Sequence, residues 1–237
     1  MLTELEQTSR ASWARNIDEY RMLWPDTEVV RFLGRTFRRG ERSGVRALDI
    51  GCGGGRHLSC LAREGFEVYG ADYNLGALQQ ARRAVRAEGG EAGLVVSDIA
   101  HPPFADGQFD VVVAWGVLFN TMPERTVEML REIRGMLRCG GRLLANWRTT
   151  DDDLMGRGQQ VGERTYLLDD RAASAGLDGT LYTFSTRDEV ERAHEAAGLR
   201  VDNVERRDLW IDGVSVRCSW WITWASRPDE SAEGDGR

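Results

Sequence analysis

The chain has 237 residues, of which 41% are hydrophobic and 29% charged, a composition typical of a soluble globular protein with one large α/β domain or two small ones. Its formal net charge of −7 argues against a nucleic-acid backbone as the main partner, and no apolar run is long enough to cross a bilayer. All 31 basic residues are arginine, and the absence of lysine excludes a lysine Schiff base and the phosphate-binding lysine of a Walker A loop.

Residues 1–40 are expected to be mostly helical and to form a cap. Pro25 should lie in the first turn of one helix. The apolar residues that follow it recur at helical spacing: Val29, Val30, Leu33 and Phe37. Three aromatic residues, Trp13, Tyr20 and Trp24, either pack this region onto the domain or close a ligand site.

From residue 45 onward, short apolar runs alternate with amphipathic segments. Strands are expected at residues 45–51, 66–73, 92–99, 109–118 and 142–148. Helices are expected between them, at residues 56–65, 75–90 and 123–141. Continuous apolar strands separated by amphipathic helices indicate a parallel sheet that is covered on both faces.

The last third of the chain departs from this rhythm. Residues 149–180 are polar, glycine-rich and too long for a simple connection, so we expect a functional lid or insertion. Thr186 and Glu189 have the spacing of a capping box, which predicts a helix start. Residues 214–225 alternate like a half-buried strand, preceded by a hairpin turn. Residues 229–237 are expected to be a disordered tail.

The stretch "DIGCGGG" is a glycine-rich turn between a predicted strand and a predicted helix. A dinucleotide-binding GxGxxG pattern would need its third glycine at position 56, which is Arg56. The pattern present is instead Asp49 followed by GxGxG, at Gly51, Gly53 and Gly55. Neither a Walker A loop nor a complete dinucleotide fingerprint is therefore present.

The acid followed by GxGxG resembles the class I S-adenosylmethionine (SAM)-dependent methyltransferases, in particular the small-molecule enzymes of the quinone-biosynthesis and tellurite-resistance types. Two further motifs support the resemblance, with Asp72 after the second predicted strand and Asp98 and Ile99 after the third. The family has a Rossmann-like, doubly wound α/β fold. The resemblance thus implies a seven-stranded, mostly parallel sheet with an antiparallel C-terminal hairpin strand. It also implies a methyltransferase domain over residues 41–228.

The resemblance also implies the cofactor, SAM, and its product, S-adenosylhomocysteine (SAH). Asp72 would accept hydrogen bonds from the ribose hydroxyls, Asp98 and Ile99 would contact adenine, and residues 115–118 would line the methyl-transfer channel. The full set of expected cofactor-binding residues is Asp49, Gly51, Gly53, Gly55, Asp72, Tyr73, Asp98, Ile99 and Trp115.

We expect methyl transfer to N or O of a small metabolite, with secondary metabolism as one setting. No catalytic base and no metal site are identified. His57 is open between three roles: contact with the cofactor carboxylate, contact with the acceptor, or packing. The acceptor-side candidates are Tyr20, Trp24, Asn120, Asn146 and Arg148. A SAM-binding cyclase or decarboxylase and a non-catalytic SAM-binding protein are the alternatives.

The remaining expectations concern partners and compartment. The four cysteines form no CxxC pair, which favours free thiols over a zinc site. The first residues lack the pattern of a secretory signal, so a cytoplasmic location is expected. The partner is expected to be a small-molecule acceptor, without nucleic acid or membrane, and the protein a monomer or homodimer.

Overall fold

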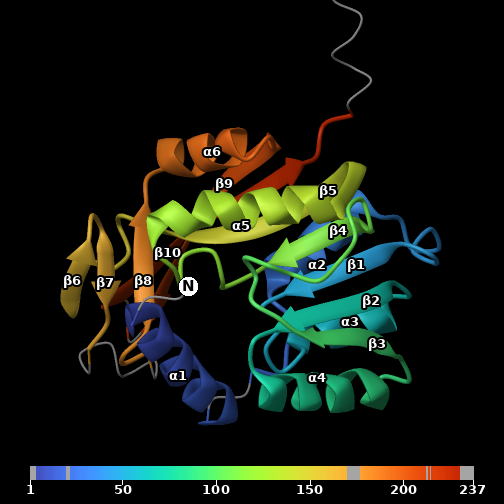
Figure 1. Ribbon diagram of the computed structural model, residues 1–237, viewed down its shortest axis with the longest axis horizontal. Coiled ribbons are helices and arrows are strands. Elements are labelled where there is room, and N and C mark those ends of the chain that lie inside the picture. Colours follow the sequence, from blue (N-terminus) through green and yellow to red (C-terminus); the bar gives the residue numbers. More distant parts are fainter. Residues whose placement is uncertain (1–3, 20–21, 170–176, 212, 214, 230–237) are drawn as a thin grey trace, which may run out of the picture.

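The computed structural model describes residues 4–19, 22–169, 177–211, 213 and 215–229. The described residues form six helices and ten strands, and the ten strands make up one sheet (Figure 1). In chain order these are α1 (Glu4–Glu19), α2 (Thr27–Thr36), β1 (Arg46–Ile50), α3 (Arg56–Arg63), β2 (Glu67–Asp72), α4 (Leu75–Ala87), β3 (Ala92–Val96), β4 (Phe109–Ala114), α5 (Pro123–Met136), β5 (Leu137–Thr149), β6 (Gln159–Gly162), β7 (Thr165–Leu167), β8 (Leu181–Ser185), α6 (Arg187–Ala196), β9 (Arg200–Ile211) and β10 (Val216–Ser226).

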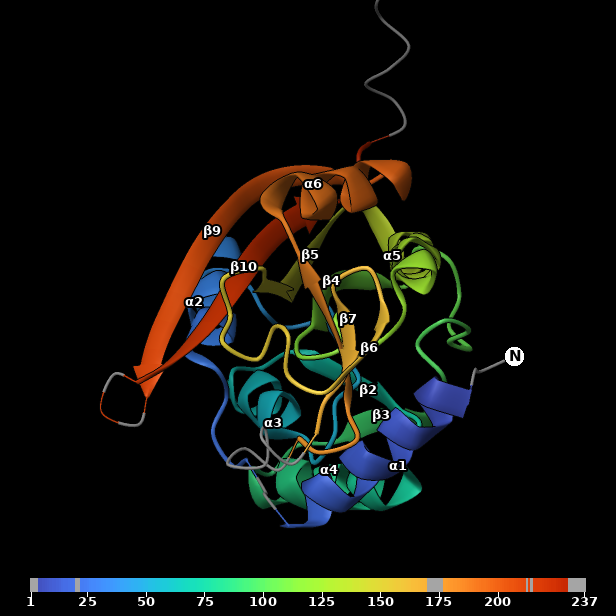
Figure 2. The same cartoon turned by 90° about the vertical axis from the view of Figure 1, so that its left-hand side faces the viewer.

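The sheet has the strand order β3-β2-β1-β4-β5-β8-β7-β6, and the β9–β10 hairpin joins it through β10 and β5. Strands β1 to β5 pair in parallel, whereas β10 runs antiparallel to both β5 and β9. Figure 2 shows the long β9–β10 hairpin at the edge of the molecule. The doubly wound, mostly parallel architecture with an antiparallel hairpin is therefore confirmed.

The expected number of seven strands is too low. The seven expected strands correspond to β1–β5, β9 and β10, and the described residues add β6, β7 and β8. β6 and β7 form a hairpin inside the segment expected to be an insertion, and β8 pairs with β7 and with the end of β5. β6 and β7 lie in this polar segment and pair through their backbones, which no hydrophobic pattern announces. β8 is a short, buried run that follows the segment and was not singled out as a strand.

Two helical layers cover the parallel strands because successive residues of each strand face opposite sides. On β4, Val112 packs in a cluster with residues of α5, including Leu130 and Ile133. Its neighbours Val111 and Val113 pack in the cluster formed with α2, α3 and α4. This three-layer arrangement leaves the carboxyl ends of the strands as the edge where loops gather.

The two N-terminal helices lie in different places. α2 packs in the helical layer, with Val29, Phe32 and Leu33 buried. It begins after Asp26, whose side chain accepts a hydrogen bond from the Glu28 amide at 2.9 Å, so Pro25 precedes the helix rather than occupying its first turn. α1 instead lies between α4 and β8, across the carboxyl ends of the strands (Figure 1).

Other local expectations have clear outcomes. α6 starts with the expected capping box, in which Thr186 and Glu189 bond reciprocally. β9 and β10 pair antiparallel as a hairpin, as expected, and residues 212 and 214 of its turn lie outside the described residues. Most of the expected tail, residues 230–237, lies outside the described residues, as do residues 170–176 of the expected insertion.

Candidate functional site

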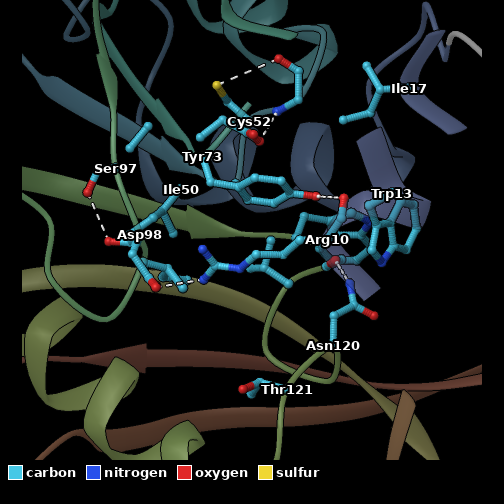
Figure 3. Close-up of a pocket in the computed structure, with 18 of the residues that line it drawn as sticks. Arg10, Trp13, Ile17, Ile50, Cys52, Tyr73, Ser97, Asp98, Asn120 and Thr121 are labelled. Carbon is cyan, nitrogen blue, oxygen red and sulfur yellow. Dashed lines mark hydrogen bonds and ion pairs between the residues drawn. The ribbon is translucent and has the colours of Figure 1, made fainter. Parts of the chain in front are cut away.

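A cavity of about 220 Å³ lies at the carboxyl ends of β1 to β4. The glycine loop forms one wall, the residues that follow β2 and β3 form another, and α1 closes it (Figure 3). In doubly wound sheets, ligands bind at this edge, beside the switch in strand order between β1 and β4. The cavity is therefore the candidate functional site.

The conformation of the glycine loop leaves no room for side chains at two positions. Gly51 has φ +71°, and a Cβ atom there would lie 2.1 Å from Cγ1 of Val117. Gly55 has φ +85°, and its Cβ would lie 2.7 Å from Cα of Ala81 in α4. The glycines thus allow the loop to pack tightly between the segment after β4 and α4, which keeps its backbone at the cavity wall.

Asp72 ends β2 and connects it to the glycine loop. Its carboxylate accepts hydrogen bonds from the Gly53 amide at 2.9 Å and from the Asn74 amide at 2.8 Å. The side chain is only 5% exposed, and burial raises the pKa of Asp72 above its ordinary value, an effect that the two amides partly offset. A carboxylate has about four lone-pair sites, so Asp72 can accept further donors from the cavity.

Helix α1 is fastened across the cavity by charged side chains. Arg10 donates to Asp98 Oδ2 at 2.6 Å, and its guanidinium lies 5.0 Å from the ring centre of Tyr73. Arg125 of α5 donates to Glu6 at 2.8 Å and lies 3.6 Å from the same Asp98 oxygen. These contacts tie α1 to the ends of β2 and β3 and to α5.

The contacts to Asp98 also change its ionisation. Burial alone would raise the pKa of Asp98, but the hydrogen bond from the Ala100 amide and the positive charges of Arg10 and Arg125 hold the pKa below its ordinary value. Asp98 is therefore a carboxylate at neutral pH, and it is shared between two arginines.

Of the α1 residues at the cavity, Trp13 was considered from the sequence as a residue that packs or closes a ligand site, whereas Glu6, Arg10 and Ile17 were not singled out. Glu6, Arg10, Trp13 and Ile17 all line the cavity. Their spacing of three or four residues places them on one face of a helix, and this is the signal that could have found them.

Three side-chain atoms in the cavity wall are buried and have no hydrogen-bond partner among the described residues: Trp13 Nε1, Asn120 Oδ1 and His57 Nε2. Asn120 is oriented, because its Nδ2 donates to the Gly116 carbonyl at 2.5 Å. Its Oδ1 is thus left as an acceptor. Unpaired buried polar atoms are costly, so these three atoms mark where a ligand can supply partners.

The structure brings most of the expected cofactor residues together. Those that line the cavity are Gly51, Gly53, Asp72, Tyr73, Asp98, Ile99 and Trp115. Gly55 begins α3 next to the cavity. Asp49 is 1% exposed and lies behind the wall, next to His57.

Among the expected acceptor-side residues, only Asn120 lines the cavity in the described structure. Asn146 is buried, and it supports the wall by accepting from the Gly116 amide at 2.7 Å. Trp24 is 76% exposed and does not line the cavity. Tyr20 lies outside the described residues.

Arg148 lies in a separate buried cluster. It donates to Asp152 at 2.7 Å, and its guanidinium is 4.6 Å from the ring centre of Trp220 and 5.2 Å from that of Tyr182. It does not line the cavity, because its side chain is used to pair with Asp152 and to pack on these rings.

The described residues contain no group of three or more histidine, cysteine, aspartate or glutamate side chains placed to hold a metal ion. No described helix is long and apolar enough to span a membrane.

Comparison with known proteins identifies the domain around this cavity. Residues 47–141 match the family model of a methyltransferase domain. Methyltransferase GfsG of Streptomyces halstedii is 36% identical over 132 residues, which are 51% of this chain and 47% of that protein. The match thus spans about half the length of this curated relative.

Solved structures share the fold over most of the chain. A SAM-dependent methyltransferase from Methanosarcina mazei superposes with a TM-score of 0.72 at 20% identity, covering 88% of this chain and 100% of the other. A 1,6-didemethyltoxoflavin-N1-methyltransferase from Burkholderia thailandensis, with 1,6-didemethyltoxoflavin and SAH bound, gives 0.69 at 18% identity, covering 97% and 92%. Residues 47–141 of the chain thus match a methyltransferase domain, and the chain has the fold of solved SAM-dependent methyltransferases.

Proposed function

We propose that the protein transfers the methyl group of SAM to a nitrogen or oxygen atom of a small molecule. The observation that carries the proposal is the cavity itself, where the glycine loop, Asp72 and Asp98 meet under α1. The solved structure from Burkholderia thailandensis, an N1-methyltransferase with SAH bound, supports both the cofactor and the reaction class.

The residues present fit SAM. Asp72 has lone pairs free for the ribose hydroxyls, and Asp98 and Ile99 follow β3 at the position where the adenine edge would lie. The remaining part of the cofactor, its methionine, would then run from Asp72 toward the glycine loop on β1. That direction follows from the strand order β3-β2-β1.

SAM supplies an activated methyl group on a sulfonium, so the protein need not activate a leaving group. The chain's own task is to align the acceptor with the methyl–sulfur bond and to keep water out. α1 performs the second task, since its ion pairs with Asp98 and Arg125 hold it across the cavity.

Asn120 supports a nitrogen or oxygen acceptor that carries a hydrogen. Because Nδ2 of Asn120 is committed to the Gly116 carbonyl, Oδ1 faces the ligand as an acceptor. An N–H or O–H group of the substrate can donate to it, whereas a carboxylate cannot. Trp13 Nε1 offers a donor for a second polar atom of the same substrate.

The cavity lining also contains the apolar residues Ile17, Val117 and Met129, beside polar residues such as Thr121. Figure 3 places Trp13, Ile17 and Asn120 on the side away from Ser97 and Asp98. A flat or apolar molecule with a few polar atoms fits such a wall.

The described part of residues 149–180 supports this end from behind. Leu154 and Leu168 form a buried cluster with Phe119, the neighbour of Asn120, and Trp13 packs against that cluster. We therefore assign the 149–180 segment a role in shaping the acceptor end.

The four free cysteines of the structure fit a reducing compartment, which agrees with a cytoplasmic enzyme.

The proposal is tested with SAM that carries tritium in its methyl group. Candidate acceptors are phenols, heteroaromatic N–H compounds, benzoates and tRNA. We expect label in an N–H or O–H small molecule and none in benzoate or tRNA. Labelled product formed from tRNA alone, or SAM consumed without transfer of label, would overturn the small-molecule assignment and favour a nucleic-acid or a non-methylating enzyme.

Substitution of Asn120 tests the acceptor end separately. Asn120→Ala should lower kcat/KM for the labelled acceptor by roughly 10-fold, because one hydrogen bond to the reacting group is lost, while SAH affinity stays unchanged. Asn203→Ala is the matched control, since Asn203 lies on β9 and not in the cavity wall. Equal activity of both variants would remove Asn120 from the acceptor site.

A further inference from the structure

A second cavity lies between the first turns of α5, the helix α6 and the strand β8. α5 and α6 lie side by side (Figure 1), and Arg131 of α5 donates to the Ala196 carbonyl of α6 at 3.2 Å. The turn between β6 and β7 closes one side. The volume of this second cavity is about 440 Å³, within the range of about 300–1,000 Å³ for small-molecule sites. No described residue lines both this cavity and the one beside the glycine loop.

The floor of the second cavity is apolar and aromatic. Phe119, Trp147 and Phe184 line it, and each of these side chains is less than 5% exposed. Leu118 adds a buried aliphatic group. The indole N–H of Trp147 is already used, in a hydrogen bond to Thr223 at 3.3 Å. The floor therefore favours an apolar or aromatic group of a ligand.

The charged side chains of the lining leave one cation and one anion without a partner. Arg164 donates to Glu163 at 2.7 Å and also to Glu189, so these three side chains neutralise one another. Arg192 of α6 and Glu124 of α5 line the same cavity. Neither has an oppositely charged group within 4.0 Å in the part of the chain that the structure describes. Both charges are thus available to a ligand.

Arg164 has two further features that point to a ligand. Its φ of +50° is the one positive value among the non-glycine residues that the structure describes. Such unfavourable backbone conformations are concentrated at functional sites. Its Nε atom is buried and donates to no described residue. A buried donor without an acceptor is costly, so a ligand that supplies an acceptor at this turn would be stabilised.

We propose that the second cavity binds an apolar amino acid. The side chain of the ligand lies on the aromatic floor, its carboxylate binds Arg192 and Nε of Arg164, and its ammonium group binds Glu124. A monoanion would face the free carboxylate of Glu124, and a monocation the free guanidinium of Arg192. A zwitterion with an apolar side chain matches both charges and the floor. This site is separate from methyl transfer and does not depend on the proposed function.

The second cavity shares a wall with the acceptor end of the first. Thr183 of β8 lines the second cavity, and its amide donates to the Phe119 carbonyl at 2.8 Å. Its hydroxyl donates to the Thr121 carbonyl at 2.7 Å. Asn120, which lies between these two carbonyls, lines the first cavity. An amino acid on Phe119 and Thr183 therefore contacts the segment that carries Asn120, and not the residues expected to bind SAM.

The experiment is calorimetric titration of the full chain with L-phenylalanine and three analogues. L-Phenylalaninamide lacks the carboxylate, 3-phenylpropionate lacks the ammonium group, and L-alanine lacks the aromatic side chain. We expect L-phenylalanine to bind, each charge-deleted analogue to bind about fivefold more weakly, and L-alanine more than about tenfold more weakly. The affinity for L-phenylalanine should be the same with and without saturating SAH, so a failure of the proposed function leaves this test intact.

Two variants assign the charges to the two ends of the ligand. Arg192→Gln should weaken L-phenylalanine and 3-phenylpropionate by about fivefold and should not weaken L-phenylalaninamide. Glu124→Gln should weaken L-phenylalanine and L-phenylalaninamide by the same factor and should not weaken 3-phenylpropionate. Arg187→Gln is the matched control, because Arg187 is an exposed arginine of α6 outside the cavity lining.

A third variant blocks the space itself. Ala196 lines the cavity on α6, and Ala196→Phe should abolish binding of all four compounds while the protein stays folded in denaturant unfolding. Three results would overturn the inference: no binding of L-phenylalanine, competition between L-phenylalanine and SAH, or equal affinities for L-phenylalanine and its two charge-deleted analogues. Equal effects of Arg192→Gln and Arg187→Gln would likewise overturn it, because the ligand would then not lie at Arg192.

Discussion

The Arg148→Met substitution separates the stability of the fold from the function of the cavity. Arg148 forms a buried ion pair with Asp152, whose side chain is fully buried. Removing one member of such a pair costs about 3–5 kcal/mol, because the other charge remains uncompensated. Asp152 keeps backbone donors, from Ser219 at 2.7 Å and from Leu154 at 3.0 Å, so we expect the lower end, about 3 kcal/mol.

The assay is denaturant unfolding of the variant and of a matched control, Arg142→Met. Arg142 lies on the same strand, but its ion pair with Asp202 is partly exposed, so its loss should cost less than about 1 kcal/mol. SAH affinity of a folded Arg148→Met protein should equal that of the unsubstituted chain, since Arg148 does not line the cavity. A loss of stability below about 1 kcal/mol, or a loss of SAH binding by the folded variant, would refute this reasoning.

Two further predictions use ionisation. Burial raises the pKa of Asp208, but hydrogen bonds from Arg217, Ser219 and Arg206 outweigh this effect and lower the pKa to about 2. The charge of Asp208 therefore stabilises the fold above the unfolded-state pKa of about 3.9, and this contribution is lost as the pH falls toward 2. In denaturant unfolding, Asp208→Asn should therefore be less stable than the unsubstituted chain at pH 6 and equal to it near pH 2; a constant difference at both pH values would contradict this. Burial, with Asp49 and Asp72 nearby, raises the pKa of the Cys52 thiol, whereas Cys139 is exposed. Iodoacetamide at pH 8 should thus modify Cys139 before Cys52, as followed by mass spectrometry. Modification of Cys52 before Cys139 would contradict the burial of the glycine loop.

The sequence predicts the central sheet well for a physical reason. The strands β1, β2 and β4 are buried on both faces, and such strands appear as continuous apolar runs. The acids Asp72 and Asp98 were singled out through the resemblance to the methyltransferase family, and they meet at the cavity because residues that follow parallel strands gather at one edge of the sheet. The alternation of residues 214–225 likewise announced the antiparallel strand β10.

Features that depend on contacts between distant residues could not be predicted. β6 is an edge strand without buried residues, so it has no pattern to detect. The Arg10–Asp98 ion pair joins residues 88 positions apart, and only the packing of α1 brings them together. Arg148 ends a strand at the ligand edge, yet its side chain turns to Asp152 and the aromatic rings.

Calorimetric titration of the protein with SAH, beside its Asp72→Asn variant, tests the central claim most directly. We expect one SAH bound per chain, and a weakening of roughly 10- to 100-fold in the variant, because a carboxylate that accepts ribose hydroxyls is replaced by an amide. Unfolding of both proteins by denaturant controls for the amides of Gly53 and Asn74, which Asp72 also accepts. Absence of SAH binding by the unsubstituted chain, or equal affinity of a folded Asp72→Asn protein, would contradict the cofactor site described for this cavity.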